Sequence, residues 1–200
     1  MMRFFALLLI PLWMSASNLK EKIDHIIIIY LENRSFDNLF YGYKGADTSD
    51  NPLESYSLQK DGDEKLYPHI EMGSEAIRSG FPKQIDNAPF LLDRYVSQEG
   101  MIPDMVHRFY QNILQINNGK NDRFAQISNE KALVMGYHDM SGSHLWKYAK
   151  EFTLCDRFFA AAYGGSFLNH QWLIAAQTPY VGKETNISRY ELDGKGEIVK

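Results

Sequence analysis

Residues 26–33 read Ile26-Ile27-Ile28-Ile29-Tyr30-Leu31-Glu32-Asn33, and no other segment argues as strongly for a fold class. The run is β-branched and lacks polar alternation, which is typical of a strand covered on both faces in a parallel sheet. After Glu32 and Asn33, residues 34–40 predict a turn into a short helix with Ser35 as its N-cap. We therefore expect two side chains with oxygen acceptors at the carboxyl end of a central strand, where open α/β sheets collect ligands.

The order of strand, turn and helix recurs near residue 160. Residues 152–158 predict a largely buried strand, in which the single cysteine, Cys155, is a small core residue. Gly164 and Gly165 predict a tight turn, and residues 167–176 are compatible with a helix. This order favours the α/β class.

Two further helices are expected between these segments. After Pro103, apolar residues share one helical face beside a polar row (Val106, Phe109, Tyr110, Ile113 and Leu114; His107, Gln111 and Gln115). A second helix is expected from Ser141 or Ser143 to Glu151. Residues 44–90 are rich in Gly, Asp, Ser, Lys and Pro, and predict an irregular surface insertion instead of a second domain.

Composition and charge exclude several classes of protein. The 200 residues are 44% apolar and 23% charged, which suits one globular domain with a core and not a disordered chain. The formal net charge of −4, without a basic run, argues against nucleic acid as the main partner. Residues 1–17 contain Arg3, followed by an apolar run shorter than the ~20 residues of a membrane span and then by small residues. This order predicts a signal peptide. We expect a secreted or periplasmic protein whose domain lies in residues 18–200, with no membrane span after signal removal.

Ser166 is the strongest candidate nucleophile. After two glycines at a helix start, its hydroxyl would project where amide N–H groups and the helix dipole favour an anion such as phosphate. A serine needs a base or a metal, and Glu32 and Asn33 offer hard oxygen ligands for a divalent cation, although they leave its shell unfinished. Each residue taken alone also fits a plain role: Ser166 a helix cap, Glu32 a solvated carboxylate, His107 a surface residue. His138-Asp139 fits either a metal or acid–base pair or a turn with a capping aspartate.

Three blocks of sequence together resemble the bacterial phosphoesterase family that includes phospholipases C and secreted acid phosphatases. They are residues 25–40, with Glu32-Asn33-Arg34-Ser35-Phe36-Asp37-Asn38; residues 163–170, Tyr163-Gly164-Gly165-Ser166-Phe167-Leu168-Asn169-His170; and residues 106–122 with 133–137. The Gly-Gly-Ser form followed by Asn-His resembles the acid phosphatase branch more than the phospholipase branch. The resemblance implies an alkaline-phosphatase-like three-layer α/β/α sandwich with a mostly parallel central sheet.

The resemblance also implies a role for each candidate residue. Ser166 would be the nucleophile, and Glu32, Asn33 and Ser166 would hold a divalent metal ion. Substrate binding would fall to Asn169, on a phosphoryl oxygen, and to His170. His107 would stand near the leaving group or a phosphate oxygen.

The function that this resemblance implies is a metal-dependent acid phosphatase with a phosphoseryl intermediate. Two alternatives stay open: a phospholipase C that acts on phosphodiester lipid headgroups, and a truncated, inactive remnant that at most binds phosphate. Further metal-binding aspartates and active-site histidines lie in the C-terminal half of such proteins, and residues 181–200 contain no Asp-Asp pair and no histidine. We therefore expect this chain to represent the N-terminal portion of the catalytic domain, with an incomplete central sheet.

Overall fold

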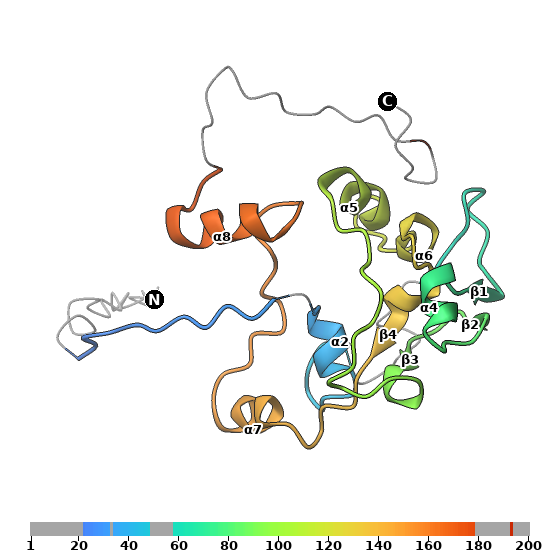
Figure 1. Cartoon of the computed structure of the whole chain (residues 1–200). Coiled ribbons are helices and arrows are strands. Elements are labelled where there is room, and N and C mark those ends of the chain that lie inside the picture. Colours follow the sequence, from blue (N-terminus) through green and yellow to red (C-terminus); the bar gives the residue numbers. More distant parts are fainter. Residues whose placement is uncertain (1–21, 33, 49–57, 179–192, 194–200) are drawn as a thin grey trace, which may run out of the picture. The chain divides into compact units, whose positions relative to one another are not determined.

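The computed structural model describes residues 22–32, 34–48, 58–178 and 193 (Figure 1). The chain divides into two compact units, Met1–Glu32 and Asn33–Lys200, and each is considered by itself. The predicted signal peptide at 1–17 and Asn33 lie outside the described residues, and so do nearly all residues after 178.

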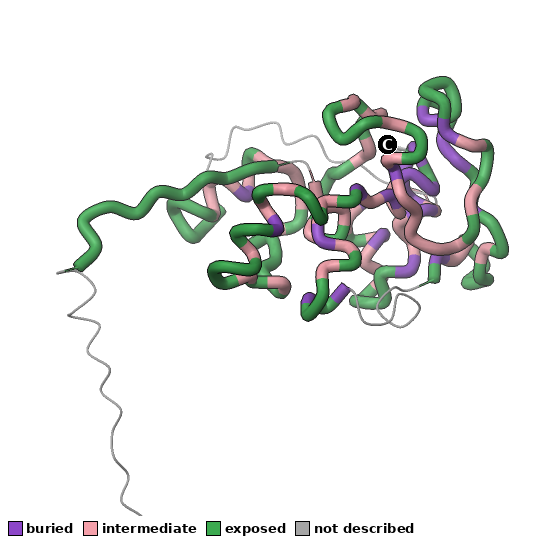
Figure 2. Tube along the Cα trace, turned by 90° about the horizontal axis from the view of Figure 1, so that it is seen from below, coloured by how far each residue is buried: buried purple, intermediate pink, exposed green. Residues whose placement is uncertain are grey.

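The described part of the first unit, residues 22–32, contains neither helix nor strand. Ile26 and Ile27 are 80% and 85% exposed, and the segment is exposed throughout (green in Figure 2). The predicted strand over 26–31 is thus not formed among the described residues. A strand covered on both faces requires paired neighbours, and no described segment pairs with this one.

The second unit alternates short helices with two small sheets, which is consistent with part of an α/β phosphoesterase fold. The sheets pair β1 with β2 in antiparallel fashion and β3 with β4 in parallel, Phe90 opposite Gly136 and Leu91 opposite Tyr137. In chain order the elements are α2 Phe36–Phe40, β1 His69–Glu71, α4 Ser74–Arg78, β2 Gln84–Asp86, β3 Phe90–Leu91, η1 Leu92–Arg94, α5 Phe109–Ile116, α6 Phe124–Ile127, η2 Ala132–Met135, β4 Gly136–Tyr137, α7 His144–Glu151 and α8 Ser166–Ala175.

The hydrophobic core draws on the segment that was expected to be an irregular surface insertion. Its buried members are Ile70, Met72, Ala76, Phe81, Leu92, Ala125, Ala132 and Leu133. Half of them lie between residues 70 and 81, and the 44–90 segment also carries β1, α4 and β2. Composition identified the loops here, but it missed the short apolar positions that pack against η1, α6 and η2.

Helix α5 buries the face opposite to the one expected. It begins at Phe109 instead of near Pro103, and its buried residues are Gln111 and Gln115. Phe109 and Ile113, from the predicted core face, are 46% and 42% exposed. The helical period is correct, but which face is covered depends on the neighbouring segment: α5 packs beside α6, and its buried residues come from the polar row.

The C-terminal part of the second unit confirms two helices and corrects one strand. Ser143 caps α7, because its Oγ accepts the Trp146 N–H at 3.2 Å, and α8 forms as expected from Ser166. Residues 152–158 form no strand, and Cys155 is exposed, not a core residue. As with residues 26–31, no described strand pairs with this segment.

Gly136 should be intolerant of a side chain. Its backbone angles are ordinary, but a Cβ there would lie 2.7 Å from Cγ of Leu92, which is fully buried. We expect Gly136→Ala to lower the free energy of unfolding by about 1–3 kcal/mol through overpacking, measured by urea denaturation. Gly142→Ala is the matched control, since a Cβ there meets nothing within 4 Å. Equal stability of the two variants would contradict the packing described here.

Candidate functional site

The turn before α8 presents Ser166 at the start of a ten-residue helix. Gly164 has φ +123°, a conformation that favours glycine, and Gly165 occupies the N-cap position without a side chain to cap the helix. The first N–H groups of α8 therefore have no side-chain partner at the N-cap. Together with the helix dipole, they favour an anion beside the Ser166 hydroxyl.

Asn169 holds this turn in place. It is buried, its Oδ1 accepts the Ala162 N–H at 3.2 Å, and its Nδ2 donates to the carbonyls of Ala162 and Gly165 at 3.2 and 3.3 Å. Both N–H groups of the amide are thus used by the turn. The contact with a phosphoryl oxygen that was expected of Asn169 would require one of these bonds to open. In this structure the side chain of Asn169 holds the turn that precedes Ser166.

His107 lies against the same turn. A Cβ on Gly165 would be 4.0 Å from both His107 Cδ2 and the His107 carbonyl oxygen. Nδ1 of His107 lies 2.7 Å from the Met105 carbonyl, which can only accept, so Nδ1 carries a proton. In the neutral ring Nε2 then bears the lone pair, and the imidazole is half exposed. The structure thus brings together His107 and the Ser166 turn, which the sequence could associate only by resemblance.

Two asparagines that the sequence analysis did not single out support this arrangement. Asn112 Oδ1, on α5, accepts the Gly164 N–H at 3.2 Å. Asn129 holds the segment before His107, because its Oδ1 accepts the Val106 N–H at 2.8 Å and its Nδ2 donates to the Asp104 carbonyl at 2.9 Å. Neither has a local sequence signal, since each bonds a segment more than twenty residues away.

His170 makes a local contact. Its Nδ1 lies 2.8 Å from the Ser166 carbonyl, one helical turn earlier, so the ring donates to the backbone of α8. This bond fixes the ring beside the helix start. Its expected role in substrate binding remains a prediction.

The expected metal ligands are not assembled in the described residues. Glu32 is exposed and belongs to the first unit, and Asn33 lies outside the described part of the chain. No group of three or more His, Cys, Asp or Glu within the described ranges is arranged to hold a metal ion. The donor chemistry of Glu32, Asn33 and Ser166, all oxygen, nonetheless suits a hard divalent cation.

His138 pairs with Asp93, not with its neighbour Asp139. The His138 side chain is buried, and its Nδ1 lies 2.7 Å from Asp93 Oδ1. Asp139 instead accepts the Ser141 N–H at 3.0 Å, and hydrogen bonds from the Ser141 backbone and hydroxyl lower the pKa of Asp139. The structure thus shows the turn with a capping aspartate at Asp139.

A pocket of about 310 Å³ lies elsewhere, next to α2 and β4. Its lining includes Asn38, Tyr41 and Tyr137. None of the expected site residues lines it, so the described pocket is separate from the Ser166 turn.

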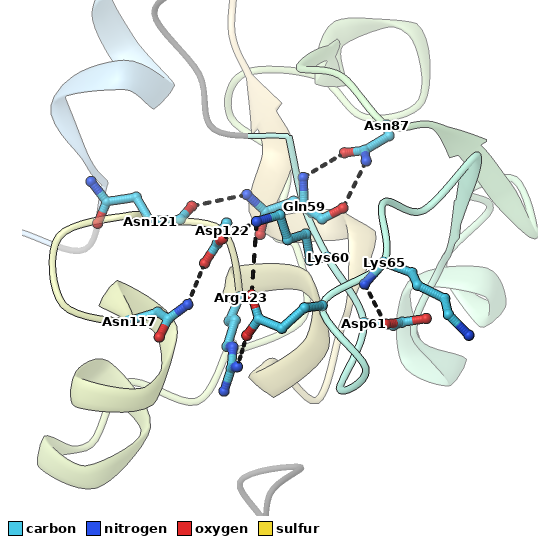
Figure 3. Close-up of polar contacts among 10 residues, drawn as sticks. Gln59, Lys60, Asp61, Lys65, Asn87, Asn117, Asn121, Asp122 and Arg123 are labelled. Atoms are coloured by element: carbon cyan, nitrogen blue, oxygen red, sulfur yellow. Dashed lines mark hydrogen bonds and ion pairs between the residues drawn. The ribbon is translucent and has the colours of Figure 1, made fainter.

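A buried polar network fixes the loop that follows α5 (Figure 3). Asp122 accepts from Asn117 Nδ2 at 2.7 Å and pairs with Lys60 Nζ at 3.1 Å, and the Lys60 N–H donates to the Asp122 carbonyl at 2.8 Å. Gln59 completes the connection, since its Oε1 accepts the Ala125 N–H at the start of α6. The network thus anchors α5, which carries Asn112.

The charge of Asp122 should make folding sensitive to acid. Burial alone would raise its pKa, but hydrogen bonds from Asn117 and Lys60, with the Lys60 charge, lower it below the ordinary value. A lowered pKa in the folded chain gives stability above the unfolded pKa, about 4, which is lost as the pH falls further. We expect Asp122→Asn to flatten the fall in unfolding free energy between about pH 5 and pH 3, measured by urea denaturation. Asp63→Asn, at a largely exposed carboxyl, is the control and should keep the wild-type pH dependence of the unfolding free energy. If that pH dependence were identical in wild type and Asp122→Asn, the stabilising role of the Asp122 charge would be refuted.

Comparison with known proteins identifies the family of this chain. Residues 23–198 match the family model described as the phosphoesterase family. The non-hemolytic phospholipase C of Pseudomonas aeruginosa is 25% identical over 194 residues, which cover 96% of this chain and 26% of that protein. The chain thus spans about a quarter of the length of this curated relative. No solved structure matches this chain. Among the described residues, no helix has the length and apolar character needed to cross a membrane.

Proposed function

Because the chain belongs to the phosphoesterase family, we propose that it hydrolyses phosphate esters with Ser166 as the nucleophile. The observation that carries this proposal is the placement of Ser166 at the start of α8, without a side-chain cap, with His107 packed against the preceding turn. A helix start that favours an anion, a hydroxyl and an imidazole are the parts that phosphoryl transfer requires.

The proposed reaction has two displacements at phosphorus. Ser166 Oγ gives its proton to solvent and attacks the phosphorus, the bond to the ester oxygen breaks, and the alcohol leaves with a proton that the doubly protonated ring of His107 delivers from Nε2. Water then attacks the phosphoserine and gives a proton to Nε2 of the neutral His107 ring, the bond from phosphorus to Oγ breaks, and Oγ regains a proton from solvent, which leaves inorganic phosphate and free Ser166. The N–H groups of α8 stabilise the negative oxygens throughout, since they are already oriented by the helix.

We also propose that Glu32, Asn33 and Ser166 hold a divalent cation. When bound, such an ion favours the serine alkoxide and neutralises charge on the phosphoryl group. Asn169 and Asn112 hold the turn that carries Ser166, whereas His107 serves the leaving group. His170 and Asn169 remain the proposed substrate-binding residues, Asn169 after release of one of its bonds to the turn.

The substrate class proposed first is a phosphate monoester, as in an acid phosphatase. The Gly-Gly-Ser turn followed by Asn169-His170 supports that branch, while the match to a phospholipase C supports the alternative of a phosphodiester lipid headgroup. The proposed location is secreted or periplasmic, on the strength of the signal-like residues 1–17. A third possibility is a non-catalytic protein that binds phosphate without turnover.

One experiment separates these three functions. The purified chain is stripped of metal with a chelator, supplied in turn with Mg²⁺, Mn²⁺ or Zn²⁺, and assayed on p-nitrophenyl phosphate and on phosphatidylcholine vesicles. Hydrolysis of the monoester supports the acid phosphatase, and release of the lipid headgroup supports the phospholipase C. Binding of inorganic phosphate with no turnover under any metal would overturn the enzymatic proposal.

A further inference from the structure

The side chain of Asn129 bonds the backbone on both sides of Met105. Its Nδ2 donates to the Asp104 carbonyl at 2.9 Å, and its Oδ1 accepts the Val106 N–H at 2.8 Å. The Val106 N–H and the Met105 carbonyl belong to one planar trans peptide, in which they point in opposite directions. The bond from Asn129 to the Val106 N–H therefore also fixes the direction of the Met105 carbonyl.

The segment that carries Asn129 is firmly held. Asn129 itself is exposed, but its chain neighbours Ser128 and Glu130 are 5% and 3% exposed. The Glu130 carboxylate accepts the N–H of the fully buried Ala76 at 2.9 Å, and the Glu130 N–H donates to Ser128 Oγ at 3.2 Å. The amide of Asn129 thus ties the segment before His107 to the core of the second unit.

The Met105 carbonyl sets the orientation of the His107 ring. Nδ1 lies 2.7 Å from this carbonyl, and the opposite edge of the ring, where Cδ2 is bonded to Nε2, faces Gly165: a Cβ on that glycine would lie 4.0 Å from Cδ2. A half-turn of the ring would exchange Nδ1 with Cδ2 and Nε2 with Cε1, and would lose the bond to Met105. The carbonyl therefore selects the orientation with Nε2 on the side of the Ser166 turn, and it keeps the proton of the neutral ring on Nδ1.

We propose that Asn129 is a positioning residue for proton transfer by His107, because the peptide that it fixes carries the carbonyl that orients the ring. This inference rests on the proposed function, in which Nε2 gives a proton to the leaving alcohol and later accepts one from water. Without Asn129, the Met105–Val106 peptide is free to rotate. The Asp104 carboxylate, 3.8 Å from Nδ1, then competes for the ring.

The kinetic test uses two esters that differ in their need for a proton. We expect Asn129→Ala to lower kcat/KM for glycerol phosphate by about 10–100-fold, a part of what a general acid contributes. The loss for p-nitrophenyl phosphate should be smaller, because its leaving group hardly needs a proton. Asn129→Leu, similar in size to asparagine and without hydrogen-bonding groups, should behave in the same way and replaces the alanine variant if that one does not fold.

Asn87→Ala is the matched control. The Asn87 amide also bonds backbone groups of distant residues, since its Nδ2 donates to the Gln59 and Tyr67 carbonyls at 2.8 and 2.9 Å and its Oδ1 accepts the Gln59 N–H at 2.9 Å. None of these bonds involves residues 104–107. This variant should lose stability in urea, but its folded fraction should keep the wild-type ratio of kcat/KM for the two esters.

A second measurement observes the ring directly and needs no turnover. Nitrogen-15 NMR of the neutral imidazole should show the proton of His107 on Nδ1 in wild type, and a mixture of the Nδ1-H and Nε2-H forms in the Asn129 variants. His69, whose ring bonds Asp86, is the internal control, and its signals should be the same in all these proteins.

The outcomes distinguish this inference from the proposed function. Wild type without hydrolysis that depends on Ser166 overturns the proposed function, and the role of Asn129 in turnover with it. With an active wild type, a selective loss for glycerol phosphate together with a mixed His107 tautomer supports the inference. Unchanged rates, an equal loss on both esters or an unchanged tautomer overturns the role of Asn129 and leaves the proposed function standing.

Discussion

Ser166→Ala should abolish phosphate-ester hydrolysis, with a loss in kcat of at least about 10³-fold, since the variant lacks the atom that bonds to phosphorus. The helix itself should persist. Gly165, not Ser166, is the N-cap of α8, and Ser166 makes no side-chain bond that caps it. The loss should therefore appear in turnover and not in the unfolding midpoint, measured with p-nitrophenyl phosphate and by urea denaturation of the same preparation.

A matched control exists at the start of α4. Ser74 also follows a glycine N-cap without a side-chain cap and is exposed. Ser74→Ala should keep full activity.

Incubation of wild type with substrate and rapid quenching in acid should leave phosphate on Ser166, detected by mass spectrometry. Retained activity in Ser166→Ala would rule out the nucleophile assignment.

His107→Gln should lower kcat by about 10²–10⁴-fold, the range for loss of a general acid or base. The effect should depend on the leaving group, because an alkoxide needs a proton as it departs and p-nitrophenolate hardly needs one. We therefore expect a larger loss for glycerol phosphate than for p-nitrophenyl phosphate.

His69→Gln is the control for this variant. The His69 ring is as exposed as that of His107 and also has a hydrogen-bond partner, Asp86, but it lies on β1. It should retain activity on both esters. An equal loss on both esters in His107→Gln would argue that the residue supports the turn at Gly165 and does not protonate the leaving group.

The features that the sequence predicted correctly are those that depend on near neighbours. The hydroxyl oxygens of Ser35 and Ser143 cap helices by accepting the N–H three residues later. Gly164 allows the chain to turn because its positive φ is a conformation that favours glycine. Helix α8 and the position of Ser166 follow from the same local rules. The sequence also predicted the family correctly, because the family's motifs are contiguous stretches of sequence. The family model matches residues 23–198.

The features that the sequence could not predict are contacts between distant segments. Strand formation at 26–31 and 152–158 requires a partner strand, and the composition of a segment does not say whether one is present. The exposed face of α5, the core residues at 70–81 and the pairing of His138 with Asp93 were missed for the same reason.

Local sequence therefore determined where the Ser166 turn lies, how its helix begins and to which family the chain belongs. Only the tertiary structure decided that His107 and Asn112 meet that turn and that Asn38 bonds to β4. The physical reason is range: caps and turns are closed by bonds within a few residues, whereas these contacts join segments from about 50 to almost 100 residues apart, whose meeting depends on how the whole core packs.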